Sequence, residues 1–275
     1  MSKIIPQILG KTINSLGLIL PKLAAKYAVK LFSTPQKGKI TEDQTAFLNT
    51  AIKDSVTYND ITIQTYLWGG SKDTILLVHG WESNTFRWKD LIELLQQEDY
   101  NIVAIDAPAH GNSSNKIFNA PLYSECIHEV VKTYKPKIII GHSIGATASI
   151  IAQENHDLPS VEKNVLLGAP SNLAISVKNY ANFMGLNNRV RKAIDAYYLK
   201  HFNHLPSHYC AENFYKNNHT AGIIIHDKQD KIISYREALD IKKHYKNAEL
   251  IKTRGLGHRL KSDAVYQHIL EFLKA

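Results

Sequence analysis

The amino-acid sequence predicts an α/β fold: a mostly parallel, doubly wound sheet of about eight strands, with a helical cap inserted near residues 171–220. Two observations lead to this prediction. Short, continuous runs of β-branched and aliphatic residues, typical of strands buried on both faces, alternate along the chain with helical segments. One interval of about fifty residues then interrupts this alternation. Alternating strands and helices are typical of parallel strands joined by right-handed crossovers.

The strands are predicted from their periodicity. Residues Ile61–Trp68 alternate apolar and polar side chains, as a half-exposed strand does, whereas the other strands are mainly continuous apolar runs. They are expected at Thr74–His79, Asn101–Asp106, Lys137–His142, Asn164–Gly168, Gly222–His226 and 248–253. Helices are expected near 85–98, 120–134, 144–156, 234–245 and 262–274. In such a sheet, ligands bind beyond the carboxyl ends of the strands.

The interval from Ser171 to Ala221 is too long for an ordinary connection between two strands of one sheet. Its aromatic residues recur at spacings compatible with helices, so we predict a helical cap over the strand ends. The apolar side chains of the cap either line a substrate pocket or fill the cap's own small core.

Residues 1–39 form a basic, apolar arm that precedes a domain spanning residues 40–275. The arm contains seven lysines and no acidic residue, whereas residues 40–275 hold 26 basic and 25 acidic side chains. Apolar residues recur at helical spacing on both sides of Pro21, which predicts two short amphipathic helices. The arm either packs on its own domain or lies on a membrane surface through residues 1–35. The near-neutral body offers no basic stripe for nucleic acid, so no nucleic-acid partner is expected.

Two cysteines, Cys126 and Cys210, are too few for a disulfide framework and fit a reducing compartment. The longest apolar run of the arm, Leu18-Ile19-Leu20, is far too short to span a membrane. We therefore expect a cytoplasmic protein, either free or peripheral at a membrane. No cluster has the spacing of metal ligands and no glycine-rich phosphate loop is present, so neither a metal nor a cofactor is expected.

The stretch Gly141-His142-Ser143-Ile144-Gly145 carries the main chemical signal. A buried strand leads into it and a helix-forming stretch follows it, which is the setting of a nucleophile elbow. A β-carbon at position 141 or 145 would collide with the neighbouring strand or helix, which explains both glycines. Ser143 is thus predicted to be a nucleophile held at a helix N-terminus.

A serine hydroxyl needs a base, and the base needs an orienting acid. His258 is the predicted base, because it follows the last strand on the loop that precedes the terminal helix. Asp227 and Asp230 both follow the strand Gly222–His226 and both are candidates for the acid. Asp230 is preferred, since three loop residues let its carboxylate turn toward a histidine beyond the next strand.

With these motifs in place, residues 60–275 resemble the α/β-hydrolase superfamily. His79-Gly80-Trp81 is similar to its oxyanion loop, and Asp106–Ser113 to its Asp-x-x-x-His-Gly-x-Ser signature. The resemblance implies that the backbone N–H groups of Trp81 and Ile144 form an oxyanion hole. It also implies that His79, His110 and His142 shape the loops around the site.

The combined interpretation is a serine hydrolase that cleaves a carboxylic ester through Ser143, His258 and Asp230, by way of an acyl-enzyme. Its expected partner is a small-molecule ester. A thioesterase, lactonase, amidase or cofactor-free haloperoxidase on the same fold is the alternative, and a non-catalytic ligand-binding member is a further one. Neither the substrate-binding residues nor the oligomeric state follows from the sequence.

Overall fold

The computed structural model describes residues 4–275, and the chain divides into two compact units. The sheet unit comprises Pro35–Ser171 and Phe214–Ala275. The helical unit comprises the chain up to Thr34 together with Asn172–Asn213. Residues 1–3 of the predicted arm, Lys3 among them, lie outside the described residues.

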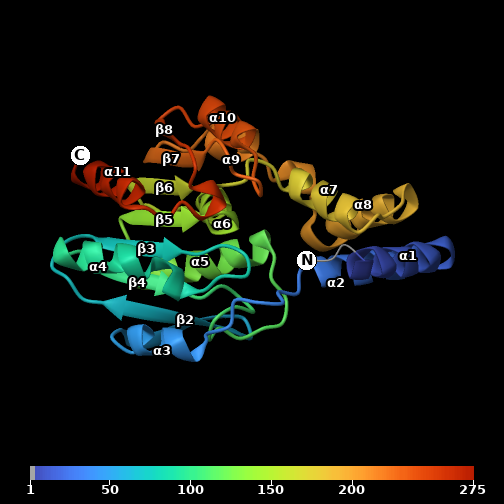
Figure 1. Ribbon diagram of the computed structural model, residues 1–275, viewed down its shortest axis with the longest axis horizontal. Coiled ribbons are helices and arrows are strands. Elements are labelled where there is room, and N and C mark those ends of the chain that lie inside the picture. The colour runs from blue at the N-terminus through green and yellow to red at the C-terminus, as the bar shows by residue number, and fades with distance from the viewer. Residues whose placement is uncertain (1–3) are drawn as a thin grey trace. The chain divides into compact units, whose positions relative to one another are not determined.

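The sheet unit contains an eight-stranded sheet in the order β1-β2-β4-β3-β5-β6-β7-β8 (Figure 1). The strands are β1 (Ile52–Tyr58), β2 (Ile61–Trp68), β3 (Thr74–Val78), β4 (Asn101–Ile105), β5 (Ile138–His142), β6 (Lys163–Leu167), β7 (Ala221–Asp227) and β8 (Ala248–Thr253). Strand β2 pairs antiparallel with β1 and β4, and every other pairing is parallel. The predicted fold class, a mostly parallel sheet of about eight strands, is confirmed.

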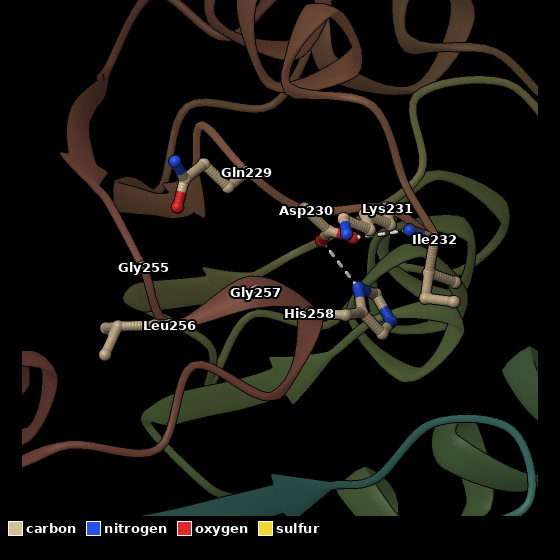
Figure 2. A pocket seen from close by; sticks show the side chains of 8 residues that line it. All are labelled: Gln229, Asp230, Lys231, Ile232, Gly255, Leu256, Gly257 and His258. Atoms are coloured by element: carbon tan, nitrogen blue, oxygen red, sulfur yellow. Dashed lines mark hydrogen bonds and ion pairs between the residues drawn. The ribbon is translucent and has the colours of Figure 1, made fainter.

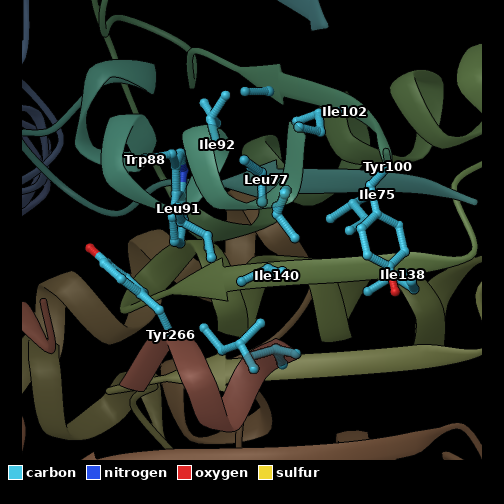
Figure 3. Packing of buried hydrophobic residues seen from close by; sticks show 14 of the residues in the cluster. Ile75, Leu77, Trp88, Leu91, Ile92, Tyr100, Ile102, Ile138, Ile140 and Tyr266 are labelled. Carbon is cyan, nitrogen blue, oxygen red and sulfur yellow. The ribbon is translucent and has the colours of Figure 1, made fainter. Parts of the chain in front are cut away.

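Helices cover both faces of the sheet. Successive side chains of each strand point to opposite faces, so each strand contributes apolar side chains to two separate clusters. On β3, Ile75 and Leu77 face a cluster formed with α3 (Glu42–Leu48), α4 (Lys89–Gln97) and α11 (Asp263–Lys274). Figure 3 shows part of this cluster, with Ile75, Leu77, Ile138 and Ile140 of the sheet near Trp88, Leu91, Ile92 and Tyr266. Leu76 and Val78 face the opposite cluster, with α5 (Ala120–Tyr134) and α6 (Ile144–Asn155). Helix α10 (Tyr235–His244) contacts β7 and β8.

Strand β1 and helix α3 were not predicted. Only Val56 of β1 is buried, so this edge strand lacks the apolar signal that identified the others. A two-residue turn at Asn59 and Asp60 joins β1 to β2, and Asn59 takes the positive φ of 50° that such a turn requires. The region near 85–98 is a short 3₁₀ turn, η1 (Thr85–Trp88), followed by α4.

The helical unit brings the N-terminal arm and the insertion between β6 and β7 together. Its helices are α1 (Ile4–Ile19), α2 (Pro21–Phe32), α7 (Leu173–Phe183) and α8 (Asn188–Phe202), followed by η2 (Pro206–His208) and the start of α9 (Ala211–Tyr215). The two helices predicted for the arm are therefore present. Helix α2 packs on α8, and the Tyr180 hydroxyl donates to the Ala28 carbonyl at 2.8 Å. Among residues 4–275, no helix combines the length and the apolar character needed to cross a membrane.

Candidate active site

Ser143 lies at a sharp turn between β5 and α6, with φ 53° and ψ −131°. A positive φ is strained for serine, and such strain persists only where the surrounding structure holds it. Here β5 is buried over its whole length, and the Ser143 N–H donates to the Leu167 carbonyl of β6 at 2.8 Å. The helix that follows begins at Ile144, so the hydroxyl sits at the N-terminus of α6.

Glycines on either side of Ser143 make this turn sterically possible. A β-carbon at Gly141 would lie 2.4 Å from the Cα of Ala146, and one at Gly145 would lie 2.2 Å from the carbonyl oxygen of His79. Both distances are far below van der Waals contact. The predicted collisions with the following helix and with the neighbouring strand end are confirmed.

The structure brings Ser143, His258 and Asp230 into one hydrogen-bonded chain. The Nε2 atom of His258 lies 3.0 Å from the Ser143 Oγ, and its Nδ1 atom lies 2.7 Å from the Asp230 Oδ2. An ionised carboxylate only accepts hydrogen bonds, so Nδ1 carries the ring proton. The lone pair of Nε2 therefore faces the serine hydroxyl, which is the arrangement a general base requires.

The side chain of Asp230 is fully buried and is kept ionised by its hydrogen bonds. Its Oδ1 accepts from the backbone N–H groups of Ile232 at 2.8 Å and Ile233 at 3.0 Å. Burial alone would raise the pKa of Asp230, but hydrogen bonds from His226, His258 and these N–H groups outweigh burial and hold the pKa well below its usual range. Figure 2 shows the carboxylate between the His258 ring and the Ile232 backbone.

Asp227, the second candidate for the acid, binds backbone and threonine instead of a histidine. Its Oδ1 accepts from the Gln229 N–H at 2.8 Å, and its Oδ2 accepts from the Thr253 hydroxyl at 2.8 Å and the Leu256 N–H at 3.0 Å. It thereby ties the loop after β7 to the loop after β8, and these loops carry Asp230 and His258.

The loop that carries His258 is held at further points. The buried His142 ring donates from Nε2 to the His258 carbonyl at 2.8 Å. Arg87 donates from Nη2 to the Arg259 carbonyl at 3.0 Å. Burial, with the nearby positive charge of Arg87, pushes the pKa of His142 well below its ordinary value, so His142 is a neutral clamp on the loop.

His79 and His110 shape the loop Gly80–Glu82 beside Ser143. The Ala107 N–H donates to His79 Nε2 at 2.9 Å, which leaves Nδ1–H to donate to the Gly80 carbonyl at 2.7 Å. The Glu82 N–H donates to His110 Nε2 at 3.0 Å. A β-carbon on Gly80 would lie 2.9 Å from the Ser143 Cβ, so this loop passes directly against Ser143. The loop-shaping role expected of these histidines is confirmed.

Asp106 organises the signature that follows β4. Its buried carboxylate accepts from the N–H groups of Thr85 and Asn112, both at 2.9 Å, and from the Tyr66 hydroxyl at 3.1 Å. Burial, together with the proximity of this carboxylate, raises the pKa of Tyr66. Asp106 is therefore a structural anchor of the loops and does not contact the Ser143–His258 pair.

A hollow of about 680 Å³ lies beside His258. Its walls are Gln229–Ile232 on one side and Gly255–His258 on the other (Figure 2). Ile232 is 67% exposed here, and Lys231 is exposed as well. The hollow thus combines an apolar and a cationic side chain next to His258.

Sequence reasoning missed His226, which also contacts the candidate acid. Its ring is buried, donates from Nε2 to the Ile233 carbonyl at 2.9 Å and lies 3.4 Å from the Asp230 Oδ2. The only sequence signal was a polar residue at the end of an apolar strand. Within residues 4–275, no group of three His, Cys, Asp or Glu side chains is arranged to hold a metal ion.

This fold, with a serine elbow at its centre, is that of the α/β hydrolases. Residues 75–217, just over half of the chain, match the alpha/beta hydrolase family, and the chain belongs to it. Both the fold and the family suggested by the sequence motifs are thereby confirmed.

Individual relatives are more distant. The serine hydrolase-like protein of zebrafish (Danio rerio) is 36% identical over 90 residues, which are 30% of this chain and 27% of the zebrafish protein. The chain thus matches little more than a quarter of that relative's length. The esterase of Pyrococcus furiosus is similar with a TM-score of 0.64 at 21% identity, over 88% of this chain and 97% of the esterase. Mouse alpha/beta hydrolase domain-containing protein 10 has a TM-score of 0.67 at 12% identity, over 82% and 97% of the two chains.

Replacing Gly145 by alanine is expected to destabilise the protein by at least about 3 kcal/mol, because the new methyl group would overlap a backbone carbonyl that cannot retreat. Gly69→Ala is the matched control, since nothing lies within 4 Å of a β-carbon there. Urea unfolding of both variants measures the difference. Equal stability of the two would show that the elbow tolerates a side chain at position 145.

Acid is expected to weaken the fold through His79 and His110. Burial lowers the pKa of each ring to about 4, whereas in the unfolded chain both titrate near 6.5. Their contribution is therefore complete above pH 6.5 and is lost as the pH falls toward about 4, by about 3 kcal/mol for each ring. The pKa of Asp230 is depressed from 3.8, so protonation of Asp230 changes the free energy of unfolding only below the pH range in which the two histidines titrate.

The measurement is the free energy of unfolding across this window for wild type and for His110→Gln, whose amide oxygen keeps an acceptor for the Glu82 N–H. In the variant, the free energy of unfolding is expected to fall less steeply as the pH decreases. His219→Gln, which changes an exposed histidine, should retain the wild-type slope. A wild-type slope in His110→Gln would contradict the assignment.

Proposed function

We propose that the protein is a serine hydrolase that cleaves carboxylic esters through Ser143, His258 and Asp230. The observation that carries the proposal is the hydrogen-bonded chain at the elbow, with 3.0 Å between Ser143 Oγ and His258 Nε2 and 2.7 Å between His258 Nδ1 and Asp230 Oδ2. Membership of the α/β-hydrolase family and the similarity to an esterase fold support it.

The proposed reaction has two halves. In the first, Ser143 Oγ attacks the ester carbonyl carbon while its proton passes to His258 Nε2. The tetrahedral intermediate then expels the alcohol, which takes that proton and leaves an acyl-serine. In the second, water attacks the acyl carbon and gives its proton to His258, and the acid is released as Ser143 regains a proton. Asp230 holds the imidazole and stabilises its charged form.

The backbone N–H groups of Trp81 and Ile144 are the proposed oxyanion donors. Ile144 is the first residue of α6, where a helix leaves its N–H groups without intrahelical acceptors and where the dipole favours negative charge. Trp81 follows Gly80 on the loop that passes against Ser143. Two such donors lower the barrier by several kcal/mol, because they meet the negative charge as it develops.

The substrate class is tested by comparing chromogenic esters of graded acyl length with thioester and amide analogues. We expect the esters to give the highest kcat/KM. Higher values for thioesters or amides would move the assignment to another acyl hydrolase of the same family.

A fluorophosphonate probe is expected to label wild type at Ser143 and to leave Ser143→Ala unlabelled, because only an activated hydroxyl attacks the phosphorus. Ser149→Ala is a useful control, since Ser149 is a buried serine of the following helix α6 whose hydroxyl donates to the Gly145 carbonyl. Mass spectrometry locates the adduct. Labelling of folded Ser143→Ala to the wild-type extent would refute the nucleophile.

Asp230→Asn is expected to lower kcat by a factor on the order of 10³–10⁴, since the amide no longer selects the tautomer in which Nε2 accepts the serine proton. Asp227→Asn is the matched control. It removes an equally buried carboxylate that contacts no histidine, so it should lower the melting temperature and cost much less in kcat. The reverse order of the two kcat losses would assign the acid to Asp227.

A further inference from the structure

Helix α2 packs mainly through alanines and leaves two leucines and a tyrosine outside. Ala24, Ala25 and Ala28 are fully buried in the helical unit, whereas Leu23, Tyr27 and Leu31 are 37%, 49% and 41% exposed. Burial of leucine stabilises a fold far more than burial of alanine does. A helix whose only task was to pack on α8 would present the opposite face, so the exposed row needs another explanation.

The exposed apolar surface extends from α2 over the turn and along α1. Nine of the 18 large apolar side chains that are exposed in the described chain fall between residues 5 and 31. We call these nine the arm surface: Ile5, Ile8, Leu9, Leu18, Ile19, Leu20, Leu23, Tyr27 and Leu31. Ile19, at the end of α1, is 81% exposed. Isolated exposed leucines are ordinary, but a cluster of this size marks a contact site.

Helical spacing arranges these residues as stripes. On α1, Ile5, Ile8 and Leu9 follow the i, i+3, i+4 pattern and are exposed, while Ile13, one turn after Leu9, is buried. On α2, Leu23, Tyr27 and Leu31 are each four residues apart, in register with Leu20. The two helices contact each other, so the stripes belong to one hairpin.

Lysines run beside the apolar stripe of α2. Lys22, Lys26 and Lys30 are exposed and spaced by four residues, and within residues 4–275 none of them forms an ion pair. No acidic residue precedes Glu42. Within the arm itself, the apolar residues are therefore accompanied by positive charge alone.

The charge of the whole chain follows the same division. The helical unit carries ten basic and two acidic residues, which leaves 23 of each for the sheet unit. The net charge of +8 thus belongs entirely to the helical unit. Pairing of this hairpin with its counterpart on a second copy would place lysines near lysines, which is unfavourable. The charge pattern selects a negatively charged partner.

We propose that the arm surface binds an anionic membrane, with α1 and α2 lying in the plane of the interface. The apolar stripes enter the boundary between headgroups and acyl chains, and the lysines contact lipid phosphates. Lysine side chains suit this position, because their apolar stems follow the stripe while the ammonium groups remain in water. This contact site is separate from the proposed catalytic chemistry and does not depend on it.

The test is co-sedimentation of the full chain with vesicles of phosphatidylcholine alone and of phosphatidylcholine mixed with phosphatidylglycerol. We expect at least about tenfold tighter binding to the anionic vesicles. Raising the salt from about 0.1 M to about 1 M shortens the screening length from about 10 Å to about 3 Å and should remove most of this preference. No binding to either vesicle, or equal binding to both, would overturn the proposal.

Matched variants separate the two contributions. Leu23→Gln with Leu31→Gln removes part of the stripe without touching the buried alanine face, and its control is Leu199→Gln with Leu239→Gln, which changes two leucines 54% and 49% exposed elsewhere. Lys22→Gln, Lys26→Gln and Lys30→Gln together are compared with Lys116→Gln, Lys135→Gln and Lys243→Gln, three exposed lysines of the sheet unit. Each arm variant should lose at least about tenfold in vesicle affinity, and each control should bind as wild type does.

Melting temperatures establish that the variants are folded, and fluorophosphonate labelling of Ser143 should be unchanged in all of them. Vesicle binding equal to wild type in both arm variants would overturn the proposal. Analytical ultracentrifugation tests whether a second copy of the chain binds the arm surface instead. A wild-type dimer that becomes a monomer in the Leu23→Gln, Leu31→Gln variant, together with no vesicle binding, would assign the arm surface to a second copy.

Discussion

The left-handed backbone of Ser143 is the constraint on which the site depends. A serine at φ 53° is stable only if the chain on both sides is fixed, and here a fully buried strand and a helix packed against the sheet fix it. The fit is so close that neither Gly141 nor Gly145 has room for a methyl group. The same closeness brings the His79–Trp81 loop against the serine, so one steric arrangement positions both the hydroxyl and the backbone of this loop.

Buried polar groups then hold the loops that the sheet itself leaves free. At the carboxyl ends of β4, β7 and β8, buried carboxylates and an imidazole form hydrogen bonds with backbone groups of the loops. Asp106 does this after β4, and Asp227 does it between the loops after β7 and β8. A buried carboxylate without partners is costly, but one that accepts several N–H bonds is stable and rigid. Rigidity of this kind keeps His258 within reach of both Ser143 and Asp230.

The sequence was sufficient for the features that depend on local pattern. Continuous apolar runs predicted the parallel strands, and the two glycines within two residues of Ser143 predicted the elbow, because each signal is a short pattern that can be recognised along the chain. Strand β1 escaped prediction because it is an edge strand with one buried residue, Val56, and so lacks an apolar pattern. Its backbone pairing with β2 holds it in the sheet instead. His226 escaped because its contact with Asp230 arises from the turn of the loop after β7.

The arm shows a different limit of sequence reasoning. Its periodicity predicted two amphipathic helices, and both exist, but periodicity does not reveal which face a neighbour covers. In the structure the neighbour takes the alanine face, because small side chains let α2 pack closely on α8. The Tyr180 hydroxyl of α7 reaches the Ala28 carbonyl on the same face. The leucine face then stays outside beside lysines. An arm that packs on its own chain therefore still retains an amphipathic surface, so packing and contact with another surface are compatible properties of the same two helices.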